Sequence, residues 1–105
     1  MHDMTKSNLE AAFAGESQAH MKYIIFADQA EKDGFTNVAR LFRANAYAEQ
    51  VHATSHFKVM KKLAETSGNL QTGIDGETYE MEEMYPAFTA VAELQDERAA
   101  VRSTK

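Results

Sequence analysis

The sequence has 105 residues, a length that suits one domain. Its net charge of -5 and pI of about 5.3 argue against nucleic acid as a main partner, because phosphate binding requires a basic surface. The absence of cysteine excludes disulfides, thiolate zinc sites and iron–sulfur clusters, so any metal must be held by oxygen and imidazole. No stretch has the character of a membrane span or a signal peptide, and we expect a cytoplasmic protein without membrane contact.

Helical periodicity runs along the whole chain, and no alternating strand pattern is present, which predicts an all-α fold. A first helix is expected from Ser7, where Ser7–Glu10 has the form of a capping box. It should end at about Lys32, because the Asp33–Gly34 pair that follows is a typical C-terminal signal.

A second helix is expected from near Thr36 to about Glu65, and the polar residues Thr66–Asn69 should break it. A third helix is expected to begin near Asn69 or Thr72 and to continue into the mid-nineties.

The single proline, Pro86, falls inside this third helix and predicts a kink there. Residues 95–98 are polar and suggest a turn, and residues 99–102 have the character of the first turn of a fourth helix. The chain therefore predicts three long helices and the start of a fourth.

The second helix carries a heptad-like stripe that is apolar at both ends and polar in its middle. This stripe consists of Val38, Phe42, Asn45, Glu49, His52, His56, Val59 and Leu63. The corresponding stripe of the first helix contains Glu16 and His20, and that of the third begins with Glu77 and Glu80. Three helices would thus turn carboxylates toward the interior.

Burying several carboxylates together is costly, because each loses its hydration and like charges repel at low dielectric. No lysine or arginine lies on these stripes to compensate, but two divalent ions would neutralise the four glutamates. Glu49 and His52 form a Glu-x-x-His pair, about one helical turn apart. Ferritin-like di-iron bundles use one Glu from each of two helices and a Glu-x-x-His from each of the others.

Other polar residues on or near the stripes have plainer interpretations. His20 is expected as a hydrogen-bond donor behind the ligands or as a satisfied core histidine. His56 has either a similar role or a place in water at the bundle end, and Asn45 can hydrogen-bond across the core. Tyr23 and Tyr85 are more often packing residues, although a phenol can also hydrogen-bond a ligand carboxylate.

Three segments resemble, in the same order, the ligand segments of the rubrerythrin family. They are Ala14–Ala19, Glu49–Ala53, and Gly76–Glu80 followed by Met84–Pro86. The likeness extends from about Asn8 to the end of the chain. It implies a ferritin-like antiparallel four-helix bundle that binds two iron ions and reduces hydrogen peroxide.

The resemblance also implies individual roles. Glu16 would be a terminal iron ligand, Glu49 a bridging ligand and Glu77 a ligand of the second iron. Glu80 and His52 would be the catalytic pair that one iron exchanges, carboxylate for imidazole, when the centre is reduced. The side chains expected beside the ligands are His20, Tyr23 and Tyr85.

The sequence departs from the family pattern in two respects. It has no cysteine for a rubredoxin domain, so electrons would come from a separate, rubredoxin-like protein. The family's fourth helix should add a glutamate and a histidine, but residues 97–103 resemble only its beginning. Either the sequence is a truncated product, or a second copy completes the bundle, swapped or as a dimer of helical hairpins, or the chain binds no metal.

We therefore predict one ferritin-like di-iron domain over residues 1–105, incomplete at its C-terminal end and homodimeric. The predicted function is a non-haem di-iron oxidoreductase of the peroxidase type. Manganese and zinc would accept the same ligands as iron. The alternative is an iron-binding, iron-storing or purely structural helical protein without turnover.

Overall fold

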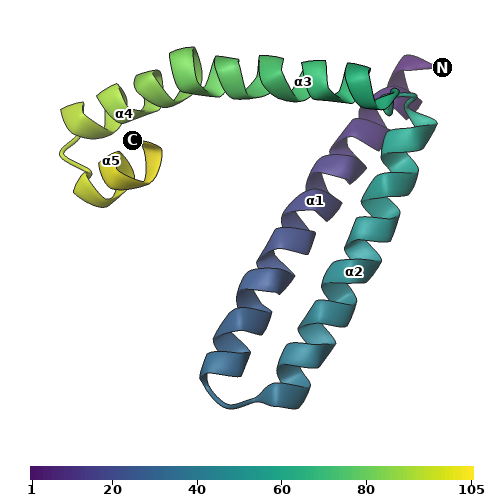
Figure 1. The fold of residues 1–105 in the computed structure, drawn as a ribbon, viewed down its shortest axis with the longest axis horizontal. Helices are drawn as coiled ribbons and strands as arrows, with labels where there is room; N and C mark the ends of the chain where they lie inside the picture. Colours follow the sequence, from purple (N-terminus) through teal and green to yellow (C-terminus); the bar gives the residue numbers. More distant parts are fainter. The chain divides into compact units, whose positions relative to one another are not determined.

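The computed structural model describes residues 1–105 and contains helices only, which confirms the all-α prediction. The elements are α1 (Asp3–Lys32), α2 (Thr36–Val59), α3 (Thr66–Tyr79), the π-helical turn η1 (Glu80–Met84), α4 (Tyr85–Leu94) and α5 (Arg98–Thr104) (Figure 1). They form two compact units, Met1–Leu63 and Ala64–Lys105, which are described separately. None of the helices combines the length and hydropathy needed to cross a lipid bilayer.

The first unit is an antiparallel hairpin of α1 and α2, which lie side by side (Figure 1). The turn between them is a Schellman motif. Phe35 N–H donates to the carbonyl of Ala30 at 2.8 Å and Gly34 N–H to that of Glu31 at 3.0 Å. Gly34 has a φ of 86°, a conformation that glycine adopts without strain. The predicted end of the first helix is therefore confirmed.

Alanines fill the contact between the two helices of the hairpin. The buried residues of this unit are Ala27, Ala30, Ala39, Ala46 and Ala53. Their small side chains allow the two backbones to approach closely, and the larger apolar side chains remain at least partly exposed at the edges. Tyr23 and Phe42 stack with their ring centroids 6.0 Å apart, and Phe26 meets Phe42 edge-on at 5.5 Å.

The start of α1 corrects the predicted capping box. The helix begins at Asp3, so Ser7 lies inside it, one turn past its first residue. His2 is the extended residue that precedes the helix, and its carbonyl accepts from Lys6 N–H at 3.0 Å. No residue between Asp3 and Ser7 breaks a helix, and the carboxylate of Asp3 favours the positive end of the helix dipole.

The end of α2 also differs from the prediction, because the helix stops at Val59 instead of about Glu65. A second Schellman motif closes it, with Lys62 N–H donating to the carbonyl of Phe57 at 3.2 Å. Lys61 takes the left-handed position at a φ of 59°, which glycine usually occupies. The sequence therefore carries no glycine signal at this helix end.

The second unit begins with α3 at Thr66, so the polar segment Thr66–Asn69 starts a helix instead of separating two. Asn69 explains this start. Its side chain accepts from the N–H of Ala64 and donates to the carbonyl of the same residue, both at 2.9 Å. These two bonds fold the preceding segment back onto the first turn of α3.

Pro86 affects the chain one turn before its own position. Proline lacks an N–H, and its ring clashes with the carbonyl four residues earlier, here that of Glu82. The π-helical turn η1 contains Glu82 and leads directly into α4, which has Pro86 in its first turn. The predicted disturbance is therefore present, as a π turn between α3 and α4.

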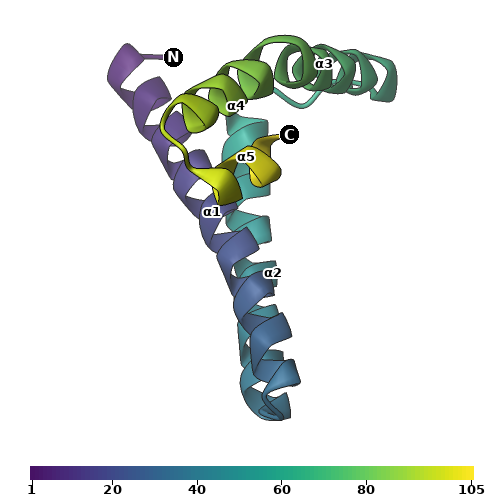
Figure 2. The ribbon, with the colours of Figure 1, turned by 90° about the vertical axis from the view of Figure 1, so that its left-hand side faces the viewer.

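The helix α5 folds back onto α4 after the short turn 95–97 (Figure 2). Thr89 and Thr104 join the two helices through their hydroxyl groups, 2.9 Å apart, and the Thr89 hydroxyl also donates to the carbonyl of Thr104 at 3.1 Å. The predicted turn and the predicted start of a further helix are both confirmed.

Candidate metal centre

Three of the predicted ligands meet on the α1–α2 hairpin. Each of Glu16, Glu49 and His52 offers one donor atom, and these three atoms lie within 4.8 Å of one another. Glu16 comes from α1, and the other two come from successive turns of α2, where residues three apart share a face. The hairpin thus brings two carboxylates and one imidazole together without help from another element.

The side chain of Glu16 is more enclosed than that of His52. Its side chain is 25% exposed, while that of His52 is 57% exposed. Its Oε1 lies 3.3 Å from His52 Nδ1, and its Oε2 lies 2.8 Å from the Nε2 of a second histidine, His56. The second contact is short, but it lacks the alignment of a hydrogen bond, so the buried Oε2 has no hydrogen-bond partner.

This arrangement fits a bound cation. The carboxylates of Glu16 and Glu49 repel each other at this distance, and a positive ion between them removes the cost. Oxygen and imidazole donors suit iron, manganese and zinc. One hairpin supplies three donors, which is fewer than the four or more that these ions require. Water molecules or side chains from outside the hairpin would complete the coordination.

The two other predicted ligands lie in the second unit. Glu77 is in the last turn of α3 and exposed, and Glu80 is the first residue of the π turn η1 and half-buried. Such π turns are often found at functional sites in helical proteins. Tyr85 begins α4, and its ring meets Phe88 edge-on at 6.3 Å. The structure shows no hydrogen bond from this phenol.

Of the residues near the ligands, His20 forms a hydrogen bond between the two helices, whereas Tyr23 and Asn45 form none. His20 joins the helices, since its Nδ1–H donates to the carbonyl of Ala46 at 2.7 Å. This bond lies one turn before Glu49 on α2 and holds the two helices in register. Tyr23 packs in the aromatic cluster with Phe42 and has no hydrogen bond. Asn45 is half-buried and forms no side-chain hydrogen bond.

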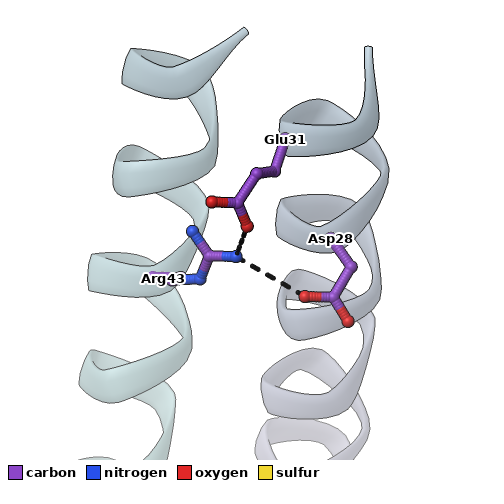
Figure 3. A network of polar contacts seen from close by, with 3 residues as sticks. All are labelled: Asp28, Glu31 and Arg43. Atoms are coloured by element: carbon purple, nitrogen blue, oxygen red, sulfur yellow. Dashed lines mark hydrogen bonds and ion pairs between the residues drawn. The ribbon is translucent and has the colours of Figure 1, made fainter. Parts of the chain in front are cut away.

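The sequence did not predict a polar contact near the loop end of the hairpin. Arg43 on α2 donates to Glu31 on α1 and lies 3.5 Å from Asp28 (Figure 3). The hydrogen bond with Glu31 raises the pKa of Arg43 above its usual value. These side chains are exposed, so the contact contributes more to the register of the helices than to stability.

Comparison with known proteins extends these observations. The family model for rubrerythrin matches residues 7–105. The chain belongs to the rubrerythrin family. Rubrerythrin-2 of Clostridium acetobutylicum is 40% identical over 114 residues, which cover 95% of this chain and 62% of that protein. Nigerythrin and rubrerythrin of Nitratidesulfovibrio vulgaris are each 38% identical, over 92% and 84% of this chain.

The chain spans little more than half the length of these rubrerythrin relatives, namely 62%, 55% and 53%. The region matched by the rubrerythrin family model includes all five predicted ligands on both units. The family resemblance expected from the three sequence segments is therefore confirmed.

Proposed function

We propose that this chain forms the main part of a di-iron centre that reduces hydrogen peroxide, with electrons from a separate rubredoxin-like protein. Membership in the rubrerythrin family supports the reaction class. The observation that carries the proposal is the convergence of one donor atom from each of Glu16, Glu49 and His52, all within 4.8 Å of one another.

In the proposed centre, both units belong to one ferritin-like domain. Glu16 would be a terminal ligand, Glu49 would bridge the two ions, and Glu77 would bind the second ion. Glu80 and His52 would be the alternative ligands of one ion. The hairpin provides one glutamate and one Glu-x-x-His pair, which is half of the ligand set of a ferritin-like di-iron bundle.

The bound iron pair supplies the two electrons that convert hydrogen peroxide and two protons into two water molecules. The side chains adjust the charge of the site. Glu80 would contribute a negative charge to the site and His52 an imidazole, so that exchange between these two ligands would let the ligand charge follow the charge of the ions. The enclosure of Glu16 between α1 and α2 would limit the movement of its carboxylate.

The first experiment measures iron per chain after anaerobic loading with ferrous iron, on the parent protein and on Glu49→Ala. Glu82→Ala is the matched control, because Glu82 is an exposed glutamate of the π turn outside the ligand set. We expect two iron ions per centre in the parent and the control and a loss of iron in Glu49→Ala. The ratio of iron to chain, read with the molecular mass in solution, tells whether a homodimer builds each centre.

The second experiment follows the consumption of hydrogen peroxide by the reduced, iron-loaded protein. Oxidation of the iron with removal of one peroxide per centre supports the peroxidase reaction. Bound iron without peroxide consumption supports the alternative of iron binding without turnover. A parent protein that binds no more iron than Glu49→Ala contradicts the proposed centre altogether.

A further inference from the structure

The proposed ligand set does not use His56, although this residue makes the shortest contact at the site. His56 lies on α2 one turn beyond His52, and its side chain is 27% exposed. Its Nε2 is 2.8 Å from Oε2 of Glu16, whereas Nδ1 of His52 is 3.3 Å from the other oxygen, Oε1. The two oxygens of Glu16 thus face two different histidines.

The buried Oε2 of Glu16 needs a hydrogen-bond donor whether or not Oε1 binds a metal. His20 cannot supply it through Nδ1, which already donates to the carbonyl of Ala46. His52 faces the other oxygen. The Nε2 of His56, 2.8 Å from Oε2, is therefore the nitrogen placed to donate once its N–H is aligned with that oxygen.

We infer that His56 is a positioning residue for the metal centre. Its Nε2–H holds Oε2 of Glu16, so that Oε1 is presented toward Glu49 and His52, where the ion binds. This inference rests on the proposed function. A ligand carboxylate that lacks such a partner is free to rotate, and loss of a partner of this kind lowers metal affinity about 10- to 100-fold.

The test is a titration with Co²⁺, whose visible absorption reports the geometry of its ligands. His56→Gln keeps an N–H near the position of Nε2, and His56→Leu removes it. Ser55→Leu is the matched control, since it places the same side chain at the adjacent exposed position of α2. We expect His56→Leu to bind Co²⁺ about 10- to 100-fold more weakly than the parent. His56→Gln and Ser55→Leu should keep the parent affinity and spectrum.

Two results of this titration overturn the inference. If His56→Leu binds as tightly as the parent, the contact with Glu16 has no effect on the metal. If His56→Gln is as weak as His56→Leu and its spectrum shows one fewer nitrogen ligand, His56 is itself a ligand. Circular dichroism of the metal-free variants verifies that each keeps its helices.

A second measurement does not depend on the metal, so it separates this inference from the proposed function. In the metal-free protein, nitrogen-15 NMR should detect a His56 Nε2 proton that exchanges slowly with water, and Glu16→Ala should abolish this signal. If the parent chain binds no Co²⁺ but shows the signal, the proposed metal centre is refuted, while the hydrogen bond between His56 and Glu16 is supported. The absence of the signal from the metal-free parent overturns the role of His56.

Discussion

Glu16 is the residue at which the conflict between stability and function is sharpest. Its carboxylate lies between α1 and α2 with one buried oxygen that lacks a hydrogen-bond donor. A plain core residue at this position would pack without this penalty. The cost of the carboxylate makes sense if the position serves to hold a cation.

Replacement of Glu16 with leucine separates these two effects. In the metal-free protein at pH 8, above the usual titration range of histidine, we expect Glu16→Leu to raise the free energy of unfolding by about 1 kcal/mol, because an apolar side chain replaces a carboxylate with a buried oxygen. Urea unfolding measures this change. The same variant should lose the stabilisation that metal gives the parent. If the metal-free variant were less stable than the metal-free parent, Glu16 would not destabilise the protein in the absence of metal.

At the scale of the elements, the helix ends show where a sequence reading succeeds. The end of α1 was predicted because Gly34 takes a left-handed backbone conformation, which is glycine's characteristic role. The end of α2 has the same hydrogen-bond pattern, but Lys61 occupies the left-handed position. Tertiary packing can hold a lysine in this conformation, and no local signal reveals it.

The left-handed conformation of Lys61 predicts that Lys61→Gly stabilises the protein. A side chain in this region costs about 1 kcal/mol, and glycine removes that cost at the end of a helix. We expect an increase of about 0.5 to 1 kcal/mol in the free energy of unfolding, measured with urea. Lys62→Gly is the neighbouring control and should not stabilise, and an equal gain in both variants would rule out this explanation.

The converse change, Gly34→Ala, should destabilise the hairpin by about 1 kcal/mol. The φ of 86° at Gly34 strains any residue with a side chain, although a Cβ there would meet no atom within 4 Å. The cost therefore comes from the backbone alone, and Gly34→Asn should recover part of it, because asparagine tolerates this region. Thermal unfolding of the two variants measures the difference.

The site was predictable from sequence to the extent that it depends on helical periodicity. Glu16, Glu49 and His52 were found because carboxylates and an imidazole interrupt apolar stripes, and helix geometry then places them on facing sides. The contact between His56 and Glu16 depends on the side-chain conformations and the spacing of two helices. Periodicity fixes neither of these quantities, so the sequence left the role of His56 open.

At the scale of the whole molecule, the division into two compact units has a consequence for stability. The proposed ligands come from both units, with Glu16, Glu49 and His52 in the first and Glu77 and Glu80 in the second. A metal ion held by both would couple their unfolding. Stability measured at one unit should then report on the other.

We expect metal to convert two separate unfolding transitions into one. With the free ion at 100 times its dissociation constant, a single site adds about 2.7 kcal/mol to the free energy of unfolding. Calorimetry of the protein with Co²⁺ and with a chelator measures both effects. Glu77→Ala combined with Glu80→Ala should keep two transitions in the presence of metal. A single transition in that double variant would exclude these glutamates as the link.

The alanines between α1 and α2 have one more consequence. Ala46 and Ala53 lie on the same helix as Glu49 and His52 and are buried against α1, so their size sets how far Glu16 stands from its partners on α2. The distance between the ligand atom on α1 and those on α2 is therefore set by side chains that are not themselves ligands. Since small divalent ions differ in preferred bond length and coordination number, a methyl group added at either alanine is a way to retune which ion the hairpin prefers, with every ligand left in place.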